Sequence, residues 1–177
     1  MIFIGKSKQD GNQEKQSLAF AVVVGLTYMI VMSTYVVQAQ SDDRVSAGLW
    51  TWKTSGCADC HGPFADGDRE DDDFPVGANL RTTRLDASAL KAAIRCGRAG
   101  TGMPAFEEGA YTIHSCYGRP LDTAPDKLEP SFRKLTADEI DAVIAYLQAR
   151  IIGHGRITRQ ECLAYYEDQP DSCEDYK

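Results

Sequence analysis

The residues Cys57-Ala58-Asp59-Cys60-His61 constrain the fold of this chain more than any other segment. Two cysteines three positions apart, followed at once by a histidine, have the C-x-x-C-H spacing typical of covalent attachment of c-type haem. In such a site both thiols add to the vinyl groups of the porphyrin, and the adjacent histidine binds the iron. So large a ring would supply much of the apolar core, and the chain without it is expected to be poorly folded.

Two other uses of a C-x-x-C pair fit this sequence less well. A structural zinc site needs four ligands, usually from two such pairs, and no second C-x-x-C and no H-x-x-x-H follows. A redox-active dithiol is typical of a βαβ pattern, and no strand alternation surrounds this motif. We therefore predict that Cys57 and Cys60 hold one haem c covalently and that His61 is an axial ligand of its iron.

A candidate for the second axial ligand lies about forty residues downstream, in Gly100-Thr101-Gly102-Met103-Pro104-Ala105-Phe106. A haem iron held by histidine on one face can take methionine on the other, which raises the reduction potential. The thioether is soft and unbranched and can reach across an apolar gap. Met103 is therefore the predicted ligand, His114 is its main competitor, and His154 is a more distant one.

The N-terminal part predicts export across a membrane. Residues 18–37 form an uncharged, mostly apolar run of twenty residues, followed by Val37-Gln38-Ala39, a small-residue pattern that suits signal peptidase. Residues 1–39 are thus expected to be a secretory signal peptide, or else a retained anchor, since the run is long enough to span a bilayer. Either alternative puts residues 40 onward, which begin with the expected domain at residues 40–153, in an oxidising compartment, predicted to be the periplasm.

The charge of the chain bears on its partners. Its formal net charge is −7 at pH 7, which argues against nucleic acid as a partner and favours a redox protein with a basic docking surface. The densest acidic stretch, Asp66-Gly67-Asp68-Arg69-Glu70-Asp71-Asp72-Asp73, follows the haem motif and is called the acidic loop below. It has three interpretations: a solvated face, a docking patch, or a calcium site, although its spacing is not that of an EF-hand.

The remaining patterns predict helices separated by loops. Asp42 or Asp43 can cap a first helix that runs into the haem motif. Residues 62–84 are expected to be an irregular loop, and residues 86–97 a short helix. Thr136 and Glu139 have capping-box spacing at the start of a last helix ending near Gly153. No run predicts a strand, so the fold class is all-α.

Taken together, these segments resemble the bacterial class I, monohaem cytochromes c. The resemblance covers roughly residues 44–152 and rests on the first helix with its haem motif, the Met103 loop and the last helix. It implies a small helical fold around one haem c, with Cys57 and Cys60 as attachment sites and His61 and Met103 as axial ligands. It also implies that Gly48 and Trp52 cross the last helix near Tyr146.

The resemblance implies that the protein transfers single electrons and is not an enzyme. We expect an exported carrier between a dehydrogenase or respiratory complex and an oxidase or other acceptor. The alternative is a membrane-anchored haem c subunit of an oxidase or dehydrogenase complex. Retention of residues 1–39 as an anchor would favour this alternative. A peroxidase needs an open sixth position on the iron, and a ligand sensor needs Met103 to be displaced, so both are less favoured.

Two segments depart from the compact family pattern: a long connection (residues 107–134) and a C-terminal extension (residues 154–177). They contain three of the four remaining cysteines, and an even number of cysteines in an exported domain suggests disulfides. Of the three possible pairings we favour Cys96–Cys116, which would bracket Met103, and Cys162–Cys173, which would staple the extension. Free buried thiols are the alternative.

Side chains that could bind the haem propionates are less specific. Arginine forks suit carboxylates, and the candidates are Arg81, Arg84, Arg95 and Arg98. Ordinary surface salt bridges explain these arginines equally well. Trp50 or Tyr111 could donate a further hydrogen bond to a propionate.

Overall fold

The structure is a computed structural model and describes residues 29, 32, 35, 38–131 and 133–176. The chain divides into two units, Met1–Asp42 and Asp43–Lys177. Residues 38–42 of the first unit are helical. Most of the predicted signal or anchor segment lies outside the described residues. No helix within the described part of the chain is both long and apolar enough to cross a bilayer.

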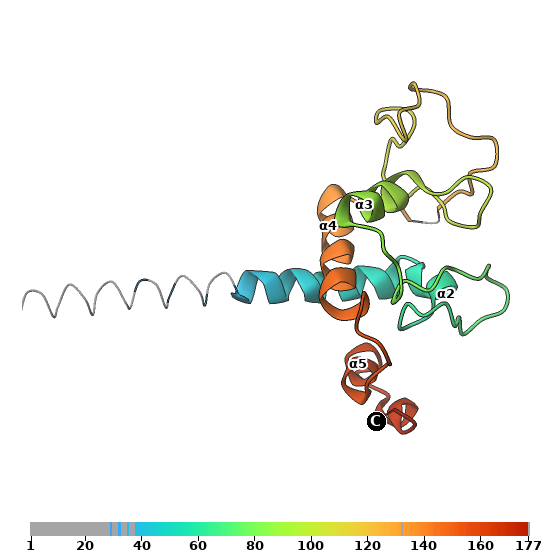
Figure 1. Cartoon of the computed structure of the whole chain (residues 1–177). Helices are drawn as coiled ribbons and strands as arrows, with labels where there is room; N and C mark the ends of the chain where they lie inside the picture. The colour runs from blue at the N-terminus through green and yellow to red at the C-terminus, as the bar shows by residue number, and fades with distance from the viewer. Residues whose placement is uncertain (1–28, 30–31, 33–34, 36–37, 132, 177) are drawn as a thin grey trace, which may run out of the picture. The chain divides into compact units, whose positions relative to one another are not determined.

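The second unit begins with the N-terminal helix, residues 43–54. Because residues 38–42 are helical as well, neither Asp42 nor Asp43 stands at a helix start, and the predicted cap there is wrong. This helix crosses α4 (Ala137–Tyr146), as Figure 1 shows. At the crossing, a β-carbon on Gly48 would lie 2.7 Å from the β-carbon of Tyr146. Because Gly48 has no side chain, the two helices can approach closely here. This confirms the expected crossing of Gly48 near Tyr146.

The two longer downstream helices begin at side-chain caps, of which the one on α4 was predicted. In α3 (Ala87–Cys96) the Asp86 side chain accepts from the Ala89 backbone N–H. In α4, Thr136 and Glu139 form the capping box, which satisfies N–H groups that have no partner within the helix. The last helix does not run on unchanged to Gly153, because residues Leu147–Ile151 form a π-helical turn, η1.

The core lies where the N-terminal helix, α3, α4 and η1 meet. Its most deeply buried members include Trp52, Ile140, Val143, Leu147 and Ile151, each at most 2 % exposed. Four of these, all except Trp52, lie on α4 and η1. Within the described residues there is no strand, only the isolated bridges Glu107–Leu135 and Ala110–His114. This helical architecture agrees with the predicted all-α class.

The long connection packs as a separate layer beside the C-terminal end of α3. The Cys96–Cys116 disulfide joins the two, and Tyr111, 1 % exposed, packs against it. The Tyr117 hydroxyl donates to the carbonyl oxygen of Gly97 at 2.9 Å. The connection is therefore attached to the residues that precede the Met103 loop.

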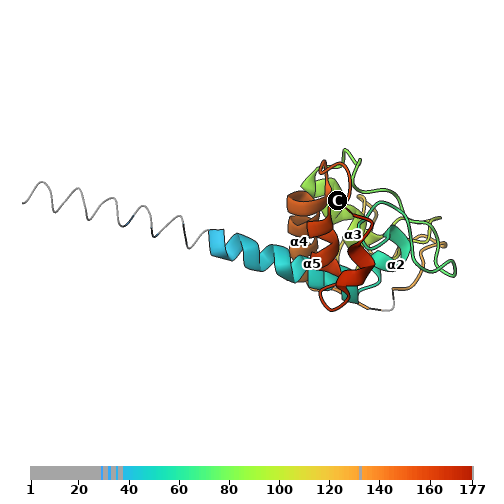
Figure 2. The ribbon, with the colours of Figure 1, turned by 90° about the horizontal axis from the view of Figure 1, so that it is seen from below.

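The C-terminal extension contains a helix that the sequence analysis did not predict. Helix α5 (Arg159–Tyr165) begins with a capping box of Thr158 and Glu161, and a 3₁₀ turn, η2 (Pro170–Cys173), follows it. Cys162 and Cys173 form a disulfide. Figure 2 shows α5 close to the N-terminal helix, where Lys53 donates to the Tyr165 carbonyl oxygen at 2.7 Å. Tyr165, which ends α5, also packs against the core.

Candidate functional site

The sequence-predicted site residues surround one cavity of about 230 Å³. Its walls come from the N-terminal helix, the haem motif, the following loop, α3, the Met103 loop and the last helix. The residues that matter here are Trp52, Cys57, Cys60, His61 and Met103, all of which line it. Most of the other lining side chains are apolar, including Ile94, Phe106, Val143 and Leu147. The cavity thus has a mainly apolar wall that carries two thiols, the imidazole of His61 and the thioether of Met103.

The haem motif forms helix α2 (Cys57–His61), a single short turn between two glycines. Gly56 and Gly62 have φ values of 78° and 80°, the left-handed region in which glycine carries no steric penalty. One helical turn brings Cys57 and Cys60 to the same side of α2, where both line the cavity and neither is in a disulfide.

The environment of these cysteines keeps both thiols protonated. Burial, together with the nearby Asp59 carboxylate, raises the pKa of Cys57 to about 12. The pKa of Cys60 is also raised, mainly by burial. A neutral thiol, or a neutral thioether made from it, suits this apolar wall because neither form buries a charge.

His61 is held by a backbone acceptor. Its Nδ1 atom lies 2.8 Å from the carbonyl oxygen of Ala78, and since a carbonyl only accepts, Nδ1 carries the proton. Nε2 is thereby left as the nitrogen able to bind a metal. Burial lowers the pKa of His61, although the Ala78 hydrogen bond opposes the shift. Neutral imidazole, the form that binds metals, is therefore favoured.

The Met103 loop is fixed by its own backbone. The Arg98 N–H donates to the Met103 carbonyl at 3.0 Å, and the Met103 N–H donates to Thr101 Oγ1 at 3.2 Å. Met103 packs against the core and lines the cavity. The competing candidates, His114 and His154, are exposed and do not line it. The structure thus brings His61 and Met103 to one cavity, whereas His114 and His154 lie outside it.

One buried polar atom tests whether a haem suits this cavity. Trp52 is 2 % exposed, yet its Nε1–H has no hydrogen-bond partner among the described residues. A buried donor without an acceptor is costly, and a propionate of a bound haem would be an acceptor of the right chemistry. The cavity also presents two thiols for covalent attachment and a neutral imidazole for the iron, on an apolar wall. These residues fit haem c.

The two residues predicted to donate to a propionate are elsewhere. Trp50 is 65 % exposed on the N-terminal helix, and Tyr111 lies in the cluster around Cys96–Cys116. Neither lines the cavity. Trp52 could have been recognised from its helical spacing to Gly48, which places both on the buried face, but nothing in the sequence indicated an unpaired indole.

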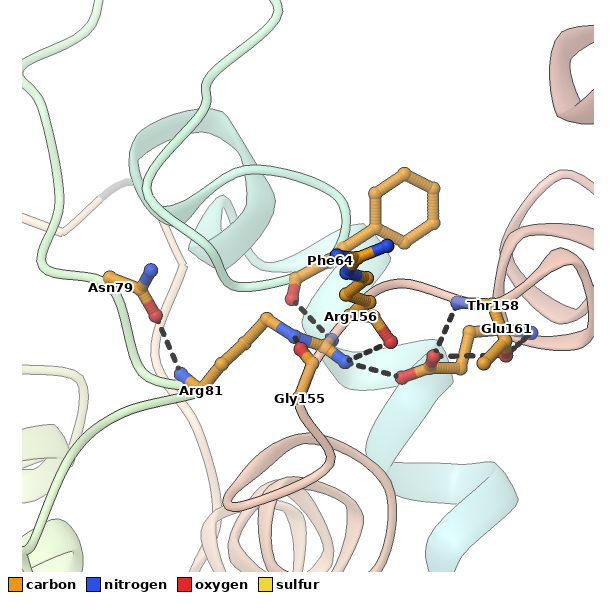
Figure 3. A network of polar contacts seen from close by, with 7 residues as sticks. All are labelled: Phe64, Asn79, Arg81, Gly155, Arg156, Thr158 and Glu161. Carbon is orange, nitrogen blue, oxygen red and sulfur yellow. Dashed lines mark hydrogen bonds and ion pairs between the residues drawn. The ribbon is translucent and has the colours of Figure 1, made fainter. Parts of the chain in front are cut away.

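The four arginines that were candidates for binding the propionates lie in different surroundings. Only Arg98 lines the cavity. Arg95 pairs with Glu107 at 2.7 Å. Arg81 is 5 % exposed and pairs with Glu161 of α5 at 3.0 Å, within the network that Figure 3 shows. For Arg81 and Arg95 the structure therefore agrees with the salt-bridge alternative, because both guanidinium groups have carboxylate partners within the protein.

Alternative metal sites find no support in the described part of the chain, which contains no group of three or more His, Cys, Asp or Glu residues arranged to hold a metal ion. In the acidic loop, Asp71, Asp72 and Asp73 are exposed. Asp72 pairs with Arg69 at 2.9 Å. The calcium interpretation of this loop is therefore not supported.

Comparison with known proteins agrees with this chemistry. Residues 44–112 match the family described as cytochrome c oxidase, cbb3-type, subunit III, a range that contains both the haem motif and Met103. No curated protein and no solved structure matches the chain. The matched family is one of c-type cytochromes, whose domains bind covalently attached haem c with its iron and transfer electrons.

Proposed function

We propose that this protein is an exported one-electron carrier in which Cys57 and Cys60 attach one haem c, and His61 and Met103 are the axial ligands of its iron. The observation that carries the proposal is the meeting of these four residues at one mainly apolar cavity. When bound, the haem supplies an iron that gains and loses one electron. The chain holds both ligands, orients His61 through Ala78 and keeps water away.

The apolar wall also bears on the reduction potential. Burial disfavours the more highly charged oxidised state, and a methionine ligand acts in the same direction. Ile94, Phe106, Val143 and Leu147 supply much of that wall. We therefore expect a higher potential than a solvent-exposed, bis-histidine haem would have.

The proposed exchange surface lies beside the acidic loop. Pro75 and Val76 line the cavity, and Val76 is 67 % exposed, next to Phe74 at 36 %. These apolar residues directly follow Asp71–Asp73. An apolar patch bordered by carboxylates suits a redox partner with a basic docking surface, which such charges would attract.

A second candidate is a membrane-anchored haem c subunit of an oxidase or dehydrogenase complex, facing the periplasm. It is favoured by the description of the matched family as an oxidase subunit and by the length of the apolar run at residues 18–37. In the free carrier, by contrast, residues 1–39 are a signal peptide cleaved after Ala39.

The experiment that tests the proposal is the intact mass and absorption spectrum of the full chain, produced in cells that mature c-type cytochromes. We expect the mass of one covalently bound haem, a low-spin spectrum, and pigment that acidified acetone does not extract. A colourless protein, or extractable pigment, would refute it. The same mass distinguishes cleavage after Ala39 from a retained anchor, and a high-spin spectrum would favour a peroxidase.

A further inference from the structure

The guanidinium of Arg81 connects the C-terminal extension with the loop that follows the haem motif (Figure 3). Within the extension it donates to the carbonyl oxygens of Gly155 at 2.9 Å and Arg156 at 3.4 Å, and to the Glu161 carboxylate at 3.0 Å. On the opposite side it donates to the carbonyl oxygen of Phe64 at 3.2 Å. One buried side chain thus joins segments that are far apart in the sequence.

The backbone of Arg81 is held as firmly as its side chain. Its N–H donates to Asn79 Oδ1 at 2.9 Å, and its carbonyl oxygen accepts from the Gly153 N–H, also at 2.9 Å. The Leu80 N–H donates to the carbonyl oxygen of Ala65 at 2.7 Å. The chain immediately after Ala78 therefore has little freedom to move.

The preceding residues lie directly against the proximal histidine. The Gly77 N–H donates to the Cys60 carbonyl oxygen at 2.7 Å, and a β-carbon on Gly77 would come within 2.6 Å of His61 Nδ1. The next carbonyl, that of Ala78, accepts the Nδ1 proton of His61. The strength of that hydrogen bond depends on where the 77–81 segment is held.

We propose that Arg81, anchored by the C-terminal extension, is a positioning residue for His61; the inference rests on His61 being the iron ligand of the proposed function. By fixing the 77–81 segment, Arg81 keeps the Ala78 carbonyl aligned with Nδ1–H. A well-aligned acceptor sets the ring orientation and raises the basicity of a ligating histidine. The extension thereby acts on the iron site without contacting it.

Arginine suits this role for a physical reason. Its planar guanidinium presents several donors in a fixed arrangement, and here it serves three carbonyl oxygens and one carboxylate. Lysine retains the charge but not the arrangement of donors. The variant Arg81→Lys therefore weakens the anchoring while leaving the local electrostatics almost unchanged.

The test measures the His61 Nδ1 proton in the reduced, haem-loaded full chain by NMR, through its exchange with deuterated solvent, together with the midpoint potential. In Arg81→Lys we expect exchange to be at least tenfold faster. We also expect the reduction equilibrium to move about threefold toward the ferrous state, about 28 mV at 59 mV per tenfold for one electron, because a less basic histidine stabilises ferric iron less.

A second variant and a control separate positioning from stability. Thr158→Ala removes the cap of α5, which Thr158 Oγ1 forms by accepting from the Glu161 N–H. This variant changes no charge. It should also accelerate exchange of the His61 Nδ1 proton. Arg159→Lys disturbs the extension at a different contact, its bond to the Cys173 carbonyl at 2.8 Å. It should leave the His61 proton unchanged even if the melting temperature falls.

The proposal is overturned if Arg81→Lys and Thr158→Ala both leave the exchange rate within twofold of wild type. If Arg81→Lys does not mature, Thr158→Ala decides alone. An equal acceleration in Arg159→Lys would also overturn it, because general loosening would then explain the effect. Failure of the proposed function itself is recognised separately, since the wild-type chain would then lack a covalent haem spectrum.

Discussion

A β-carbon added to Gly48 would lie 2.0 Å from the carbonyl oxygen of Ala142. The N-terminal helix and α4 therefore cross with their backbones in contact, and this crossing supports one wall of the candidate haem cavity through Trp52, one helical turn beyond Gly48.

The first prediction concerns this crossing. Gly48→Ala should lower the free energy of unfolding by about 1–3 kcal/mol, as expected for overpacking at a site that cannot relax freely. Guanidinium unfolding of the haem-loaded protein measures it. Ser46→Ala, at an exposed position of the same helix, is the matched control. A variant at Gly48 as stable as that control would mean that the helices do not approach this closely.

The second prediction concerns the axial ligand. Met103→Ala should lower the midpoint potential, because a thioether ligand favours ferrous iron, by a fraction of the ~0.8 V over which axial ligands set haem potentials. It should also open the sixth position to carbon monoxide. His114→Ala is the control, since His114 is exposed and lines no part of the cavity. If His114→Ala changed the spectrum and Met103→Ala did not, His114 and not Met103 would be the axial ligand.

The third prediction concerns acid stability. Hydrogen bonding to the Thr136 backbone, above all, lowers the pKa of Glu139 from its usual value of 4.5. A carboxyl whose folded pKa is depressed contributes stability above its ordinary pKa and loses it as pH falls through the folded pKa. Wild type should exceed Glu139→Gln in stability near neutral pH, by at most about 1 kcal/mol.

That difference should vanish in acid, where wild-type Glu139 becomes protonated. Chemical unfolding of both proteins across the acid range measures it. Glu174→Gln, an exposed carboxylate beyond η2, serves as control and should show no such convergence. A difference between wild type and Glu139→Gln that stays constant with pH would rule out this role of the capping box.

The fourth prediction concerns the disulfides. Mass mapping without reduction should find Cys96 joined to Cys116 and Cys162 joined to Cys173, the pairs in contact in the structure. Replacing both Cys96 and Cys116 with serine should cost about 3 kcal/mol, because the closed loop is long, and should make Met103 easier to displace. Two free thiols on the folded protein would contradict the pairing.

The fifth prediction concerns docking. Replacing Asp71, Asp72 and Asp73 with asparagine should slow electron transfer with a basic redox protein several-fold at low salt and flatten its salt dependence, because steering charges act over a Debye length. Stopped-flow kinetics measures the rate. The matched control neutralises Asp168, Asp171 and Asp175 of the extension. Equal rates and equal salt slopes in the two triple variants would exclude the acidic loop as the docking surface.

Local spacing was enough to predict several features of this protein. The C-x-x-C-H motif needs only one helical turn to bring Cys57, Cys60 and His61 to one side, so its geometry is contained in five consecutive residues. The capping boxes of α4 and α5 are equally local, and the one at Thr158 and Glu161 was present in the sequence although no helix was predicted there. Such features depend on neighbours within one turn.

Contacts between distant segments depended on the tertiary structure. Arg81 pairs with Glu161, 80 positions away, and the buried Trp52 Nε1–H has no partner within the part of the chain that the structure describes. Sequence alone left Arg81 as one of four arginines that could bind a propionate or form a salt bridge, and it did not single out the Trp52 indole as a donor. The physical reason is that a polar side chain finds its partner, or lacks one, only when packing has decided which segments meet and which are shielded from water.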